Sequence, residues 1–101
     1  MITPPKKLPI DLTTIHSSKG AWLIAVESVA ETRADRNLLV NIVLEQAVDE
    51  GERFRVRSLG MLLPLRDAVD PDRSQNQVSQ IRQWIDSTDG DGFVDLTQRP
   101  A

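Results

Sequence analysis

The sequence predicts an α+β fold: a three- to four-stranded antiparallel meander sheet with one C-terminal helix packed on one face. Three successive segments, 21–30, 38–48 and 53–57, place apolar residues at alternate positions, which is the period of a strand. A later segment repeats apolar residues at the spacing of an amphipathic helix. The 101 residues suffice for one domain that buries roughly two-thirds of its unfolded surface.

The two ends of the chain are expected to lie outside this domain. Residues 1–9 contain three prolines and two lysines, which predicts a flexible, extended N-terminal arm. A single globular domain is expected over 10–97, followed by a tail over 98–101. Residues 12–20 are polar and end in Ser-Ser-Lys-Gly, which predicts a loop or turn before the first strand.

The second strand has a helical alternative. A helix over 35–50 would also gather apolar residues on one side, because short apolar runs are ambiguous by periodicity alone. The residues that fit this helical stripe are Leu38, Leu39, Ile42, Val43 and Ala47. We favour the strand because β-branched residues are dense here and the next segment is strongly strand-like.

The connection between the second and third strands decides which side chains share a face. If 49–51 is a three-residue hairpin loop, Gly51 falls at the left-handed position that such loops favour. An odd loop length keeps the parity of the strands, so Phe54 and Val56 would face the core with Leu44. The opposite face would carry the arginines and their acidic neighbours, namely Arg53, Arg55, Arg57, Glu45 and Asp49.

The chain after the third strand is predicted to contain an irregular apolar segment, a helix and a last short strand. Residues 59–65 are apolar without a clear period, and Pro64 cannot donate to a central ladder. This segment is therefore predicted to be an edge strand or a crossing loop that covers the end of the core. Residues 93–96 are expected to form the last strand.

The helix has two candidate starts. Asp70 followed by Pro71 supplies an acceptor cap and a proline at the first turn, and Ser74 opens a capping-box sequence. The helix is expected to end near Ser87. The predicted core combines its apolar stripe with the strands: Trp22, Ile24, Val26, Val40, Ile42, Leu44, Phe54, Val56, Val78, Ile81, Trp84 and Ile85.

Composition excludes several classes of function. The chain has no cysteine, so disulfides, thiolate catalysis and zinc–thiolate sites are impossible, and a cytoplasmic location is expected. A net charge of −3 and a pI near 5.0 argue against general binding to nucleic acid or anionic membranes. No apolar stretch approaches the roughly 20 residues of a membrane helix. Without a recognisable acid–base pair, nucleophile constellation or cofactor loop, we expect a protein that is not an enzyme.

The run Asp-Gly-Asp-Gly-Phe-Val-Asp at 89–95 carries the most specific chemistry. Carboxylates at alternate positions around a glycine allow oxygens to converge on a hard cation such as Ca²⁺. Residues 87–98 resemble the calcium loop of the EF-hand family, but Ser87 and Gln98 stand where that family has aspartate and a bidentate glutamate. The resemblance implies a weak calcium site whose ligands are Asp89, Asp91, Asp95 and the carbonyl of Phe93. No other cofactor is expected.

A second likeness lies at 10–20. There Thr14, His16, Lys19 and Gly20 resemble the threonine-x-histidine-x-x-lysine-glycine motif of UvrD-type helicases, which in that family lies near the nucleotide and single-stranded DNA. The chain has no phosphate-binding G-x-x-x-x-G-K-[ST] loop, so an ATP-driven motor is excluded. His16 is the only histidine and is predicted to be a solvated loop residue.

Arg53, Arg55 and Arg57 would present three guanidinium groups on one strand face. Such a stripe can contact phosphates or an acidic protein surface, and it can also pair with carboxylates on the neighbouring strand. We interpret the chain as a small non-catalytic adaptor or regulatory module that binds another protein through these arginines. A weak calcium-binding module and a nucleic-acid-contacting accessory protein are the alternatives, and self-association is left open.

Overall fold

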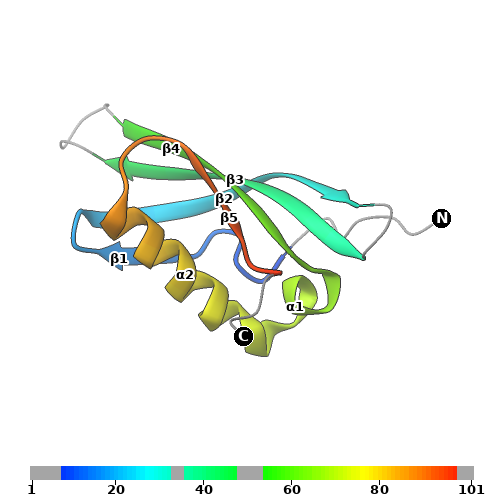
Figure 1. The fold of residues 1–101 in the computed structure, drawn as a ribbon. Coiled ribbons are helices and arrows are strands. Elements are labelled where there is room, and N and C mark those ends of the chain that lie inside the picture. The colour runs from blue at the N-terminus through cyan, green and yellow to red at the C-terminus, as the bar shows by residue number, and fades with distance from the viewer. Residues whose placement is uncertain (1–7, 33–35, 48–53, 98–101) are drawn as a thin grey trace.

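The computed structural model of the protein describes residues 8–32, 36–47 and 54–97. Five strands form one mixed, curled sheet in the order β1-β2-β3-β4-β5, and a helix lies across one side of it (Figure 1). The strands are β1 (Thr14–Ser17), β2 (Gly20–Glu31), β3 (Asn37–Ala47), β4 (Phe54–Pro64) and β5 (Gly92–Asp95). The helices are α1 (Leu65–Val69) and α2 (Ser74–Ser87), and the 3-10 turn Pro71–Arg73 runs directly into α2.

Strands β1 to β4 form an antiparallel meander, whereas β5 pairs with β4 in parallel. The predicted α+β class with one helix in the C-terminal region is confirmed. The prediction of three to four antiparallel strands falls short of five, because β1 was expected to be a loop. The last strand expected over 93–96 is present as β5, but it pairs in parallel rather than antiparallel. Parallel neighbours need a crossover connection, and α2 provides it between β4 and β5.

The segment for which the sequence also allowed a helix is a β-strand. β3 pairs with β2 on one side and with β4 on the other, so the predicted strand is confirmed over the described residues 37–47 and the helical alternative is wrong there. The loop expected over 12–20 contains β1, whose Ile15 is buried. Residues 1–7 of the expected arm and the tail over 98–101 lie outside the described residues.

β4 is a central strand, which corrects the prediction of an edge or crossing loop over 59–65. It runs unbroken between β3 and β5, and its residues Leu59, Met61 and Leu63 are buried at strict alternation. Pro64 is tolerated because it is the last residue of the strand, where the chain turns into α1. The period was hidden because the chain between these residues is also largely apolar.

The register of the β3–β4 hairpin is opposite to the predicted one. Ala47 pairs with Phe54 and Leu44 pairs with Arg57, so the six residues 48–53 separate the paired ends. This even number reverses the parity, and Gly51 with its predicted loop lies outside the described residues. Consequently Arg57 faces the core, and the placement of Phe54 and Val56 in the core is wrong.

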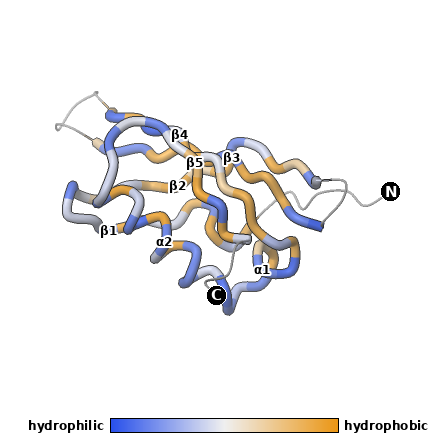
Figure 2. Tube along the Cα trace, viewed as in Figure 1, coloured by the Kyte–Doolittle hydropathy of each residue, from blue (hydrophilic) through white to orange (hydrophobic). Residues whose placement is uncertain are grey.

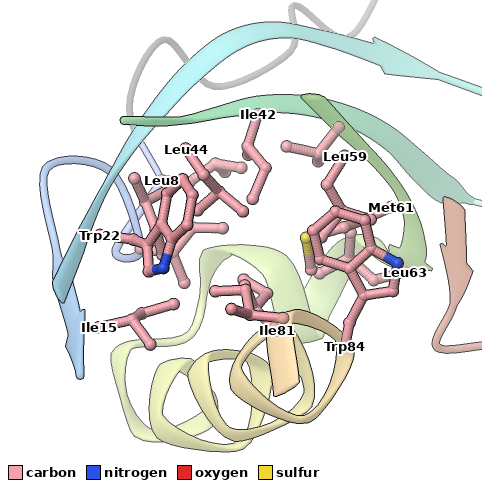
Figure 3. Packing of buried hydrophobic residues seen from close by; sticks show 14 of the residues in the cluster. Leu8, Ile15, Trp22, Ile42, Leu44, Leu59, Met61, Leu63, Ile81 and Trp84 are labelled. Atoms are coloured by element: carbon pink, nitrogen blue, oxygen red, sulfur yellow. The ribbon is translucent and has the colours of Figure 1, made fainter. Parts of the chain in front are cut away.

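The core fills the space between the concave side of the sheet and α2. Figure 3 shows strands curling over the buried side chains, with Ile81 of α2 below them and Trp22 and Trp84 on either side. Of the predicted core, eight residues are buried: Trp22, Ile24, Val40, Ile42, Leu44, Ile81, Trp84 and Ile85. Val26 and Val78 are partly buried against it. The residues that prediction omitted are Leu8, Ile10, Ile15, Leu38, Leu59, Met61, Leu63 and Ala68.

The 3-10 turn that precedes α2 begins at the predicted Asp70-Pro71 start. The carboxylate of Asp70 accepts a hydrogen bond from the backbone N–H of Asp72 at 2.9 Å, and Pro71 occupies the first turn. The capping box at Ser74 is not formed, because its hydroxyl donates to the carbonyl of Pro71 instead. Within the described residues, no helix has the length and apolar character needed to span a membrane.

Candidate interaction surface

The side of the sheet that faces away from α2 carries a band of apolar side chains, which we call the open face. The pleat directs alternate residues of each strand to opposite sides, so these residues cannot join the core. Four large ones are substantially exposed: Leu23 by 37%, Phe54 by 62%, Val56 by 55% and Phe93 by 57%. Partly buried apolar residues occupy further outward positions of the same strands: Ala25, Leu39, Val43 and Leu62. Figure 2 shows hydrophobic residues recurring along β2, β3 and β4.

Cross-strand pairing sets residues of this band beside one another, with the exposed Glu45 between two of them. Leu23 of β2 pairs with Glu45 of β3, which in turn pairs with Val56 of β4. Next along the strands, Ala25 pairs with Val43. Directly opposite residues in a sheet have β-carbons about 4.5–5.5 Å apart, so Ala25 and Val43 lie side by side, whereas Glu45 interrupts the apolar band between Leu23 and Val56.

Charged groups on the open face are acidic. Glu45 and Asp95 occupy outward strand positions, and Glu27 and Asp91 line a hollow on the same face. No lysine or arginine occupies an outward position in β1 to β5 as described. At the end of the sheet where Asn37 pairs with Pro64, Arg36 and Arg66 line a separate hollow of about 630 Å³. Its other lining residues are Asn37, Pro64, Leu65 and Val69.

The hollow on the open face centres on Gly60 of β4. It has a volume of about 350 Å³ and is bordered by the Phe93 side chain, Asn41, Glu27 and Asp91. A β-carbon at position 60 would lie 2.9 Å from Cδ2 of Phe93, so glycine allows the aromatic ring to lie close against the strand. The absence of a side chain at Gly60 therefore deepens the hollow and allows the ring of Phe93 to pack against the strand.

Arg57 organises one end of the opposite, covered face. Its side chain is only 5% exposed, and the guanidinium lies 4.2 Å from the ring centroid of Trp84 and 5.8 Å from that of Trp22. Nε donates to the carbonyl of Gly90 at 2.8 Å, and Nη2 donates to the carbonyl and hydroxyl of Thr88 at 3.0 Å each. A cation at the C-terminal end of a helix is stabilised by the helix dipole and by these carbonyls.

A second set of contacts ties the β1–β2 turn to the same end of α2. Lys19 Nζ donates to the carbonyl of Thr88 at 2.7 Å and to the carboxylate of Asp89 at 2.8 Å. The carboxylate of Asp86 accepts hydrogen bonds from the hydroxyl and the backbone N–H of Ser18, which lower the pKa of Asp86. The hydrogen bond and charge of Lys19 lower the pKa of Asp89 in the same way. We call Ser18, Lys19, Asp86 and Asp89 the turn clamp.

The structure does not bring the three predicted partner-binding arginines together on an exposed face. Arg53 lies outside the described residues, Arg55 is exposed, and Arg57 is buried in the contacts above. Glu45 lies on the other side of the sheet from Arg57, because Glu45 pairs with Val56. The predicted pairing of the arginine stripe with Glu45 is therefore wrong.

The predicted calcium ligands are also kept apart. Asp89 pairs with Lys19, the carboxylate of Asp91 accepts from the backbone N–H of Ser58 at 2.9 Å, and that of Asp95 accepts from Thr97. Phe93 lies inside β5, so this part of the run is extended rather than looped. Across 8–32, 36–47 and 54–97, no three His, Cys, Asp or Glu side chains are grouped as metal ligands.

The residues that resemble the helicase motif form a β-hairpin. Thr14 and His16 belong to β1, Lys19 lies in the turn, and Gly20 has a φ of 104°, which favours glycine. His16 is exposed, as predicted, although it lies on a strand rather than in a loop. The hydroxyl of Ser17 donates to the carbonyl of Gly20, so it serves the turn.

Comparison with protein-family models, with curated proteins and with solved structures finds no match. The geometry of the open face therefore carries the functional argument. Sequence reasoning missed this surface because it assigned Phe54 and Val56 to the core. The alternation of Arg57, Leu59, Met61 and Leu63 was the signal that could have found it.

Proposed function

We propose that the protein is a small non-catalytic interaction module that binds another protein through the open face. The observation that carries this proposal is the band of exposed apolar side chains on a sheet whose other side already has its core and helix. Contiguous exposed apolar patches on soluble domains mark interaction surfaces far more often than scattered single residues do. Four large exposed side chains, with partly buried apolar residues at neighbouring outward positions, form such a patch.

Charge supports a protein partner over a nucleic acid or an anionic membrane. The carboxylates of Glu27, Glu45, Asp91 and Asp95 surround or line the band. Phosphate groups and acidic headgroups would be repelled by them, since binding to nucleic acid depends on Lys and Arg at the contact. Central apolar contacts inside a polar rim are the usual anatomy of a protein interface.

The proposal is tested by selecting peptides from a random display library against the immobilised protein and measuring their affinities by fluorescence anisotropy. The test variant is Val56→Glu on the open face, and the matched control is Val69→Glu on α1, because both valines are about half exposed. Selected peptides should bind the control as they bind the wild type, and should bind Val56→Glu at least about tenfold more weakly. Peptides that bind Val56→Glu as tightly as the wild type would contradict the proposal.

A further inference from the structure

We infer that the partner segment is apolar and basic, with a lysine or arginine side chain seated in the hollow at Gly60. This inference rests on the proposed function and names the chemistry of its partner. The hollow is bordered by two carboxylates, the amide of Asn41, two serines and the ring of Phe93, and Gly60 leaves its floor without a side chain. A cation with several N–H donors fits both the oxygen acceptors and the ring.

These acceptors come from two strands, β2 and β3, and from the residue before β5. Asn41 uses its amide Nδ2 to donate to Ser28 at 3.0 Å, and its Oδ1 lies 3.4 Å from the position of a β-carbon on Gly60. The carboxylate of Asp91 is held at the edge of the hollow because one oxygen accepts from the backbone N–H of Ser58. Glu27 lines the opposite side, from the bulged part of β2.

Phe93 provides the remaining wall. Its side chain is more than half exposed, so an incoming cation can approach the aromatic ring. A lysine or arginine over an aromatic ring is attracted to the ring face, and more strongly when water is excluded. The same ring joins the apolar band, so one partner segment can place an apolar residue and a basic residue side by side.

A second copy of the chain does not suit this surface. A two-fold contact through the open face would place the same patch on both sides. The carboxylates of Glu27, Glu45, Asp91 and Asp95 would then meet one another with no lysine or arginine at the outward strand positions described. Like charges facing each other across an interface repel one another, which favours a basic partner.

The test compares three peptides of equal length that alternate valine or phenylalanine with lysine, serine or glutamate. Binding is measured by fluorescence anisotropy at low and high salt for the wild type, Glu27→Gln/Asp91→Asn and the control Asp72→Asn, whose residue lies away from the sheet in the 3-10 turn. The lysine peptide should bind the wild type at least about tenfold more tightly than the glutamate peptide. The double variant should bind the lysine peptide about fivefold more weakly and lose most of the salt dependence. The control variant should bind the lysine peptide as the wild type does, and the double variant should bind the serine peptide as the wild type does.

Other outcomes separate the two proposals. Equal or tighter binding of the glutamate peptide, or lysine-peptide binding that the double variant leaves intact, would overturn the basic partner while leaving the open face as a binding surface. A dimer in sedimentation equilibrium that Val56→Glu dissociates would identify a second copy as the occupant and overturn the inference in the same way. Failure of all three peptides to bind, together with no difference between Val56→Glu and wild type toward selected peptides, would overturn both.

Discussion

The two faces of the sheet differ in what covers them more than in the kind of residue they present. The concave face packs Val40, Ile42 and Leu44 against α2, and each of these side chains is fully buried. The open face presents Leu39 and Val43 from the same strand, and Val56 beside them, without a helix over them. Apolar residues occur on both faces of a strand. Which face becomes the core therefore depends on where the rest of the chain places the helix.

The two faces also differ in the sign and burial of their charged groups. On the covered face, the guanidinium of Arg57 is enclosed by two tryptophan rings and by carbonyls at the end of α2. On the open face, Glu45 and Asp95 are exposed. The cation is thus part of the folded core, and the carboxylates remain accessible to a partner.

The largest expected effect on stability is that of Arg57→Ala. Removing the stacked guanidinium leaves the carbonyl of Gly90 without this donor and the carbonyl of Thr88 with Lys19 alone, so the unfolding free energy should fall by about 3 kcal/mol in urea denaturation. Arg55→Ala on the same strand removes an exposed arginine and should change the value by less than about 0.5 kcal/mol. Similar effects of the two substitutions would mean that Arg57 is not held as the structure shows.

A matched pair of valines on β3 compares the two faces directly. Val40 is fully buried, whereas Val43 is only partly buried on the open face. Val40→Ala should cost about 2–3 kcal/mol, from lost burial and the cavity that remains, and Val43→Ala less than about 1 kcal/mol. Equal losses in denaturant unfolding would show that the open face is as tightly packed as the core.

A matched pair of glycines compares the two faces by adding a methyl group to each. A β-carbon on Gly92 would lie 2.7 Å from the indole of Trp84, and one on Gly60 would lie 2.9 Å from Phe93. The Trp84 side chain is enclosed by the core and Phe93 is exposed, so Gly92→Ala should cost about 2 kcal/mol and Gly60→Ala less than about 1 kcal/mol. Thermal unfolding followed by circular dichroism measures both, and the reverse order would contradict the assignment of the faces.

The smallest expected effect comes from the turn clamp. Hydrogen bonds from Ser18 and Lys19 hold the pKa values of Asp86 and Asp89 below their ordinary 3.8. A carboxyl with a lowered pKa in the folded state contributes stability above its ordinary value, and this is lost as the pH falls through the folded pKa. Unfolding free energy should therefore decrease below pH 3.8, and Asp86→Asn/Asp89→Asn should make that decrease shallower. Superimposable pH profiles of the variant and the wild type would exclude the clamp as a source of this dependence.

Much of the fold could be predicted because local patterns are strong. The alternation in β2 and β3, the stripe Ile81, Trp84 and Ile85, and the Asp70-Pro71 start each follow from residues close in sequence. β1 was missed because only Ile15 among its four residues is buried, so no alternation stands out. The parallel pairing of β5 depends on where α2 returns the chain, which no short pattern encodes.

The candidate surface was missed because one strand changes the face that carries its apolar residues. In β4 the outward Phe54 and Val56 precede the buried Leu59, Met61 and Leu63. An interpretation of 53–57 alone assigns the arginines to solvent, whereas the whole strand turns Arg57 inward. The inward cation is tolerated only because Trp84, Thr88 and Gly90 from distant parts of the chain satisfy it.

Nuclear magnetic resonance tests the central claim most directly, by mapping the amide shifts of isotope-labelled protein during titration with the lysine-containing peptide. The largest changes should fall on β2, β3, β4 and β5 around Leu23, Val43, Val56 and Phe93, while the exposed residues of α2 remain unchanged. Changes concentrated on α2, or around Arg55 and the β1–β2 turn with the open face unaffected, would contradict the claim that this face of the sheet is the binding surface.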